Sequence, residues 1–215
     1  TPGQAGAYTR ITVAASAPTL FYYCTNHSGM GGQANTPVTN SFSNFAGSIQ
    51  SNISPNTTSG FSIVKWVNGT SSAQTIGHGL GVKPSIIILK TLTAVQDWRV
   101  YTSTLGATHF LKLNETDAGA TASSIWNNTE PTTSVFTTGT GSQMINNTLV
   151  AYCFNDVQGF SKMGSYTGNG NADGTFIYTG FAPAFVIVKA TSISGENWQL
   201  NDNKRKTFNV NSTSL

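Results

Sequence analysis

Charged side chains are scarce in this chain. Only 9% of its 215 residues are Asp, Glu, Lys or Arg, against about 25% in ordinary soluble domains. Gly, Ser, Thr and Asn take their place, so the surface must be neutral and rich in hydroxyl and amide groups. A formal net charge of +3 is too small to drive strong binding to phosphates. We therefore expect no nucleic-acid partner.

Long apolar runs and helical periodicity are also missing. The longest apolar stretches, Ile86–Leu89 and Phe185–Val188, have the length of strands, whereas a membrane helix needs about 20 apolar residues. No long window keeps a helical period without an interrupting Gly, Pro or Thr/Asn cluster. We expect no membrane partner and few helices.

Catalytic signatures are absent as well. The chain has eight acidic residues and three histidines, and no nucleophile-elbow or paired-carboxylate pattern stands out. Its two cysteines, Cys24 and Cys153, each follow a tyrosine in a strand-like context, where buried free thiols are expected. Because catalysis needs positioned acids and bases, we expect a protein that is not an enzyme. A depolymerase, the enzymatic alternative, would need two carboxylates about 5 to 10 Å apart.

What the chain does contain is an internal duplication. The same landmarks recur about a hundred residues apart, which is the mark of a repeated structural unit. They are Gly60-Phe61-Ser62, Pro84–Lys90 and Trp98 in the first copy, and Gly159-Phe160-Ser161, Pro183–Lys189 and Trp198 in the second. We predict that Ile86–Ile88 and Phe185–Ile187 occupy equivalent strands.

Short strand signals separated by polar turns run along the whole sequence. Such spacing predicts an all-β fold, an antiparallel β-sandwich or jelly-roll-like domain. The expected strands are 8–13, 20–24, 61–67, 86–91, 98–102, 110–113, 135–137, 149–155, 161–166, 176–179, 185–190 and 198–200.

Cys24, His27 and Met30 follow one of these strands on a short loop. Thiolate, imidazole and thioether are the ligands of a blue-copper site, and the stretch resembles the final hairpin of a cupredoxin. The resemblance implies a second histidine from an earlier strand, and no histidine precedes this hairpin in the sequence. We expect no bound metal and no cofactor.

The composition divides the chain into parts. Residues 1–32 are predicted to be the C-terminal part of a cupredoxin-like module, and the Gly/Ser/Thr/Asn/Pro-rich residues 33–59 a linker. Residues 60–215 form the sandwich domain, built from copies 60–158 and 159–215, the second truncated. We expect the two copies to share one core, because the second is too small to fold alone.

Two further patterns are candidate ligand sites. Trp66 and Trp126 are candidate carbohydrate-stacking platforms, although repeated tryptophans of this kind more often fill a core. A calcium-loop pattern begins at Asn169, but Gly180 stands where that pattern requires a bidentate Glu. We expect a Gly/Asn turn there instead.

Three runs, Tyr22–Gly32, Ile76–Pro84 and Ala151–Gly170, resemble modules in virion proteins of marine tailed phages, especially cyanophages. The resemblance implies a structural or fibre-like virion protein with a cupredoxin-like hairpin before a duplicated β domain. We therefore expect a tail fibre or other appendage on the virion surface that contacts other virion proteins and attaches to the host. The alternatives are a carbohydrate-binding module on such an appendage, with a host glycan as partner, or a capsid decoration protein.

The hairpin near residues 20–30 also bears on assembly. Without further partner strands it exposes backbone donors and apolar faces, which upstream residues or neighbouring subunits must cover. We expect a homo-oligomer, a trimer by analogy with phage fibres.

Overall fold

The computed structural model describes residues 20–23, 31–34, 41–69, 72–204 and 213–214. Strands make up 37% of the chain and helix 2%, so the all-β prediction is confirmed. The chain divides into two compact units, residues 1–40 and 41–215. In the first, β1 (Leu20–Tyr23) pairs antiparallel with β2 (Gly31–Ala34). Cys24, His27 and Met30 lie outside the described residues, so the copper prediction stays a prediction.

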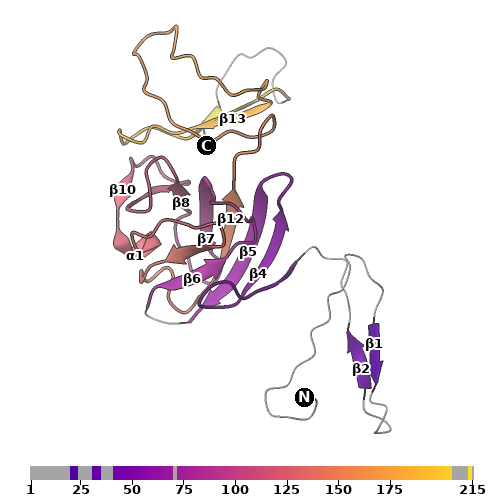
Figure 1. The fold of residues 1–215 in the computed structure, drawn as a ribbon. Helices are drawn as coiled ribbons and strands as arrows, with labels where there is room; N and C mark the ends of the chain where they lie inside the picture. The colour runs from indigo at the N-terminus through magenta and orange to yellow at the C-terminus, as the bar shows by residue number, and fades with distance from the viewer. Residues whose placement is uncertain (1–19, 24–30, 35–40, 70–71, 205–212, 215) are drawn as a thin grey trace. The chain divides into compact units, whose positions relative to one another are not determined.

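An eight-stranded antiparallel sheet forms the centre of the second unit (Figure 1). Its strands follow the spatial order β10-β9-β8-β7-β12-β5-β4-β3. In chain order they are β3 (Phe42–Asn44), β4 (Ser51–Asn56), β5 (Phe61–Asn68), β7 (Ile86–Thr91), β8 (Arg99–Thr102), β9 (His109–Lys112), β10 (Ala120–Thr121) and β12 (Asn147–Phe154). Strand β12 lies between β5 and β7, which are far from it in the sequence.

A smaller layer covers one face of this sheet. It consists of β6 (Gln74–Gly77), paired antiparallel with β11 (Val135–Thr138), and the single-turn helix α1 (Ser123–Trp126). Alternate residues of a strand point to opposite faces, and β5 accordingly buries Val64 and Trp66 while Lys65 and Val67 are exposed. This alternation is what directs the apolar residues of the sheet toward the smaller layer.

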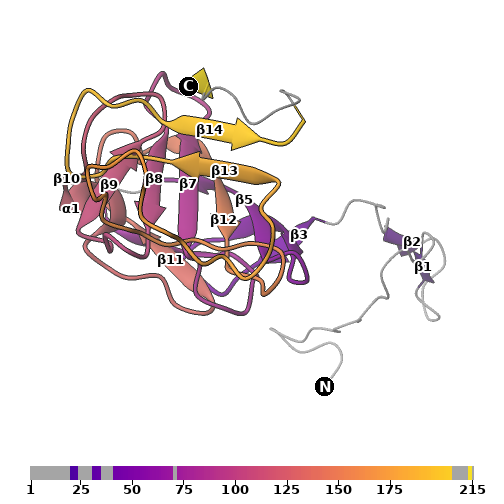
Figure 2. The ribbon, with the colours of Figure 1, turned by 90° about the horizontal axis from the view of Figure 1, so that it is seen from above.

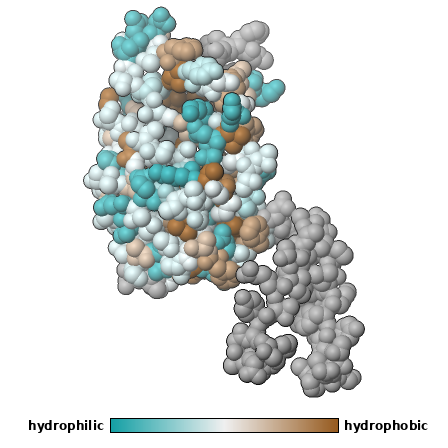
Figure 3. All heavy atoms as spheres, in the orientation of Figure 1, coloured by the Kyte–Doolittle hydropathy of each residue, from teal (hydrophilic) through white to brown (hydrophobic). Residues whose placement is uncertain are grey.

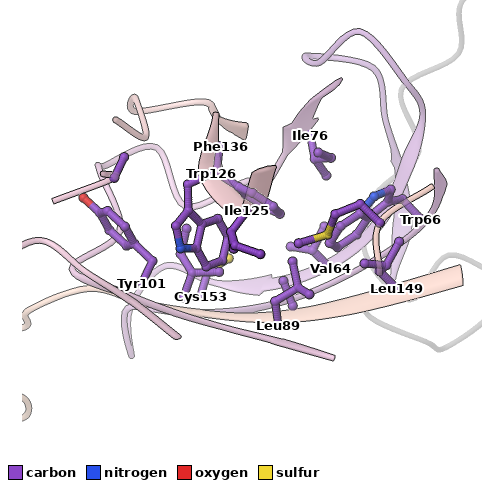
Figure 4. Packing of buried hydrophobic residues seen from close by; sticks show 14 of the residues in the cluster. Val64, Trp66, Ile76, Leu89, Tyr101, Ile125, Trp126, Phe136, Leu149 and Cys153 are labelled. Atoms are coloured by element: carbon purple, nitrogen blue, oxygen red, sulfur yellow. The ribbon is translucent and has the colours of Figure 1, made fainter. Parts of the chain in front are cut away.

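The main core fills the space between the two layers (Figure 4). Trp66 meets Phe136 of β11 edge-on, with ring centroids 5.5 Å apart, and Tyr101 meets Trp126 in the same way at 6.0 Å. Edge-to-face packing of this kind adds to the gain from burial alone. The core residues at the centre of the sheet are Ile87, Leu89, Leu149, Ala151 and Cys153.

The duplicated segment forms a second, three-stranded sheet of β13 (Phe185–Val188), β14 (Gln199–Asp202) and β15 (Thr213–Ser214). Figure 2 shows β13 and β14 side by side. This sheet repeats the antiparallel order of β7, β8 and β9. Ile86–Ile88 and Phe185–Ile187 therefore occupy equivalent strands, as predicted.

Individual hydrogen bonds are repeated together with the strands. The backbone N–H of Ser103 donates to Ser85 O at 2.8 Å, and that of Asn203 donates to Ala184 O at 3.0 Å. Lys90 Nζ donates to the carbonyl of Gln96, and Lys189 Nζ to that of Glu196 at the matching place. The duplication thus preserves the interactions that shape each hairpin, beyond the sequence landmarks.

One prediction about the organisation of the chain is wrong. Residues 33–59 are not a linker throughout, because β3 and β4 are strands of the main sheet and Ile53 is buried in its core. The prediction that the two copies share one core stays a prediction. Trp198 of the second copy packs with Val100 and Leu111 of the first copy in a cluster apart from the main core.

The central position of β7 gives a test of the core. Leu89→Ala should lower the free energy of unfolding by about 2 to 5 kcal/mol, the range for a buried leucine whose removal leaves a cavity. Leu92→Ala is the matched control, because Leu92 follows the same strand but is exposed; it should cost less than about 1 kcal/mol. Urea denaturation of both variants measures this, and equal losses would contradict the assigned core.

Candidate interaction surface

The two tryptophans predicted to bind carbohydrate lie in the core. Trp66 is 3% exposed and Trp126 is 2% exposed, so neither ring face can stack on a sugar. The prediction of a carbohydrate platform at these positions is wrong. Trp66 is inward-facing because of the alternation of β5, and Trp126 because α1 packs against the sheet.

Cys153 and His78 are both buried. Burial raises the pKa of the Cys153 thiol, which keeps it protonated and unreactive. Burial also lowers the pKa of His78 and outweighs the opposing hydrogen bond to Thr132. The ring is therefore neutral, with Nδ1 accepting from the Leu80 N–H at 3.2 Å and Nε2 lying 3.3 Å from Thr132 O. These contacts join loops and give both ring nitrogens of His78 a partner.

Three hydrogen bonds hold the carboxylate of Glu130. It accepts hydrogen bonds from Lys83 Nζ at 2.7 Å, Tyr101 Oη at 2.7 Å and the Ala107 N–H at 2.6 Å. Burial raises the pKa of Glu130, but these three donors and the Lys83 charge outweigh it and hold the pKa below its ordinary 4.5. The carboxylate ties the loop before β9 to the loop after α1.

Three other acidic side chains form ion pairs. Asp97 lies 3.5 Å from Arg99 and 3.7 Å from Lys112, Asp117 lies 2.7 Å from Lys112, and Asp156 lies 3.0 Å from Lys162. Within the described ranges no three His, Cys, Asp or Glu side chains are placed to hold a metal ion. Asp97, Asp117 and Asp156 thus each lie beside a cationic side chain.

Exposed aromatic side chains instead gather along the loop 160–181 of the second copy. Tyr166 is 51% exposed, Phe176 86% and Tyr178 79%. Thr175 Oγ1 donates to Thr167 O at 2.8 Å, so the two arms that carry Tyr166 and Phe176 meet at that point. We call Tyr166, Phe176 and Tyr178 the aromatic loop surface.

Amide side chains form the tip of this loop. The Asn171 N–H donates to Asn169 Oδ1 and the Asp173 N–H to Asn171 Oδ1, both at 3.1 Å, while Asn169 Nδ2 donates to Asp173 O at 2.9 Å. The oxygens that suggested a calcium loop thus accept backbone N–H groups, and within 168–174 only Gly170 has a positive φ. Sequence patterns did not reveal the aromatic loop surface, because Phe176–Thr179 carries a strand signal although no strand forms there.

The remaining surface agrees with the low charge of the sequence. Figure 3 shows mostly weakly polar residues on the visible face, with scattered apolar ones between them. In the part of the chain that the structure describes, no helix has the length and apolar character of a membrane span.

Comparison with known proteins identifies the family. Residues 33–215 match the model of a family described as a domain of unknown function, DUF7483, and the chain belongs to this family. No curated protein and no solved structure matches the chain.

The Glu130 cluster predicts a pH dependence of stability. A carboxyl whose folded pKa lies below its unfolded value stabilises the fold above about pH 4.5, and this contribution is lost as the pH falls through the folded pKa. Because the Glu130 side chain is 47% exposed, solvent screens its ion pair with Lys83. Glu130→Gln should therefore remove about 0.5 to 1 kcal/mol at about pH 7 and flatten the dependence of stability on acid pH. Denaturant unfolding across that range measures both effects.

Glu115→Gln provides the control, because Glu115 is exposed and accepts a bond from the neighbouring Asn114 Nδ2 at 3.3 Å. It should leave the stability and its pH dependence nearly unchanged. If the two variants behave alike, Glu130 does not carry the role assigned to it.

Proposed function

We propose that this chain is a non-enzymatic structural module of a phage virion, part of a tail fibre or similar appendage on the particle surface. The observation that carries the proposal is the repeated β meander, whose second copy presents the aromatic loop surface. Repeated β units of neutral surface suit an extended appendage, and the ionic groups described above are committed to ion pairs. Its partners are then other virion proteins and the host surface.

The aromatic loop surface favours a carbohydrate-binding role for this module. Tyr and Phe rings stack on the apolar faces of sugars, while amides such as Asn169 and Asn171 bond their hydroxyls without requiring charge. Tyr166, Phe176 and Tyr178 thus replace the two buried tryptophans as the candidate sugar platform. Attachment to a host glycan is the form of host recognition that these residues support.

Single substitutions test this attachment. Tyr178→Ala and Phe176→Ala should each weaken binding to host cells or to their isolated surface glycan by about tenfold, as for a contact residue worth about 1.4 kcal/mol. Both side chains are exposed, so the fold should be unaffected. Phe45→Ala is the matched control, an exposed phenylalanine away from this loop. The proposal fails if all three variants bind like the unchanged chain.

The same proposal includes assembly into a homo-oligomer, a trimer in the case of a fibre. A capsid decoration protein is the alternative within the virion, and labelled antibodies against the chain on intact particles would separate tail from capsid. Sedimentation equilibrium of residues 1–215 should give a mass of three chains, and a stable, well-folded monomer would contradict the oligomer.

A further inference from the structure

The two copies differ at one place in their sheets. In the first copy β7 pairs with β8 on one side and with β12 on the other. In the second copy β13 pairs with β14, and among the described residues the sheet ends at β13. Among the described residues, no strand corresponding to β12 lies beside β13.

The hydrogen-bonding pattern shows which groups of β13 face this edge. In an antiparallel pair, successive residues direct their N–H and C=O groups to opposite sides of the strand. Since Asn203 N donates to Ala184 O, Val186 and Val188 bond to β14. Phe185 and Ile187 therefore direct their backbone groups to the open side. Their counterparts in the first copy, Ile86 and Ile88, use these groups to bond to β12.

Side chains at core positions of the second copy also lack cover. Ile87 and Ile76 are completely buried in the first copy. The duplication aligns them with Val186 and Ile177, which are 39% and 48% exposed. In the first copy, the side chains that β12 contributes beside Ile87 and Leu89 are those of Cys153 and Ala151, both fully buried.

We infer that the open edge of β13 is an acceptor site for an antiparallel β-strand of the β12 type, supplied by a partner polypeptide segment. The β12 strand of the first copy indicates the chemistry of this partner. It is an extended segment of about eight residues with small or branched apolar side chains at alternate positions, as at Leu149, Ala151 and Cys153. The residue of this segment that takes the place of Cys153 lies opposite Val186. The backbone of the segment forms hydrogen bonds with the backbone of Phe185 and Ile187.

The missing strand also explains why a further segment of the second copy forms no strand. Residues 161–166 align with β5, the other neighbour of β12, and no strand forms there. A β12-type strand on β13 offers these residues a second edge to pair with. This inference is independent of the phage proposal, because it rests on the comparison of the two copies.

Residue-resolved amide exchange of the full chain tests the acceptor site. The probe is a synthetic peptide of residues 146–156, which contains β12, added under reducing conditions. Without the peptide, the amides of Phe185 and Ile187 should exchange fast and those of Val186 and Val188 slowly. With saturating peptide, exchange at Phe185 and Ile187 should slow by at least about tenfold, the effect of forming the missing ladder bonds.

Matched variants establish where the peptide binds. The same peptide with Ala151→Glu places a charge on the inward face and should give no protection. Val186→Asp in the chain should abolish the effect, while Val95→Asp, the same change at a fully exposed residue of the first copy, should preserve it. Slow exchange at Val188 in each variant reports that the β13–β14 pair remains folded.

A second format avoids dependence on peptide solubility. Residues 146–156 are appended after Leu215 through a Gly/Ser linker of about 30 residues, which raises the effective concentration of the strand. The same protection of Phe185 and Ile187 is expected. The inference is overturned if neither format protects these two amides, or if protection appears at the β3 edge instead. It is also overturned if the chain alone protects them and loses this protection on dilution, because a second copy then covers the edge.

Discussion

The insertion of β12 between β5 and β7 is the interaction on which the fold depends. β12 pairs with β5 from Asn147 to Phe154 and with β7 from Leu149 to Phe154. It therefore supplies two ladders of backbone bonds and, at the same time, the buried side chains at the middle of the core. Without it the sheet would be two separate meanders, each with an open edge over an incomplete core.

The unusual composition has a role inside the protein as well as on its surface. Three buried hydroxyls join the main sheet to segments that pack over it: Ser62 donates to His78 O at 2.7 Å, Ser51 to Gly77 O at 2.9 Å and Thr91 to Gln143 O at 2.8 Å. A buried hydroxyl that forms a hydrogen bond costs little free energy of folding, and here each bond fixes the position of one layer relative to the other. Ser and Thr thus act here as connections that a charged side chain could not make at such depth.

The sequence predicted the strands that carry strong apolar alternation. The expected strand 86–91 coincides with β7, and 61–67 and 149–155 agree with β5 and β12 to within two residues at each end. β4 was assigned to a linker because Ser51–Asn56 is polar and contains Pro55. It forms because it lies near the sheet edge, where pairing with β5 and burial of Ile53 suffice.

Candidate site residues were harder to predict, for a physical reason. Aromatic residues occur both in cores and on binding surfaces. Which of the two a given residue belongs to depends on the face of the strand from which its side chain projects. Trp66 points inward with the alternation of β5, whereas Tyr178 is exposed because its segment forms no strand. The second-copy segments 161–166 and 176–179 carry strand signals that lack a neighbouring strand, and propensity alone does not form a sheet.

The pairing of β12 with both neighbours has a consequence for synthesis of the chain. Roughly 60 residues separate the end of β7 from the end of β12, which at ordinary translation speed takes roughly 3 to 13 seconds. During this time β5 and β7 both present open edges. In the finished sheet Val150 lies between Lys65 and Lys90, which keeps the two strands about 10 Å apart. Direct pairing of β5 with β7 in that register would set the two ammonium groups side by side, and like charges in such a position oppose pairing. The two lysines thus oppose premature pairing of β5 with β7 during synthesis, so that β12 can still insert between them.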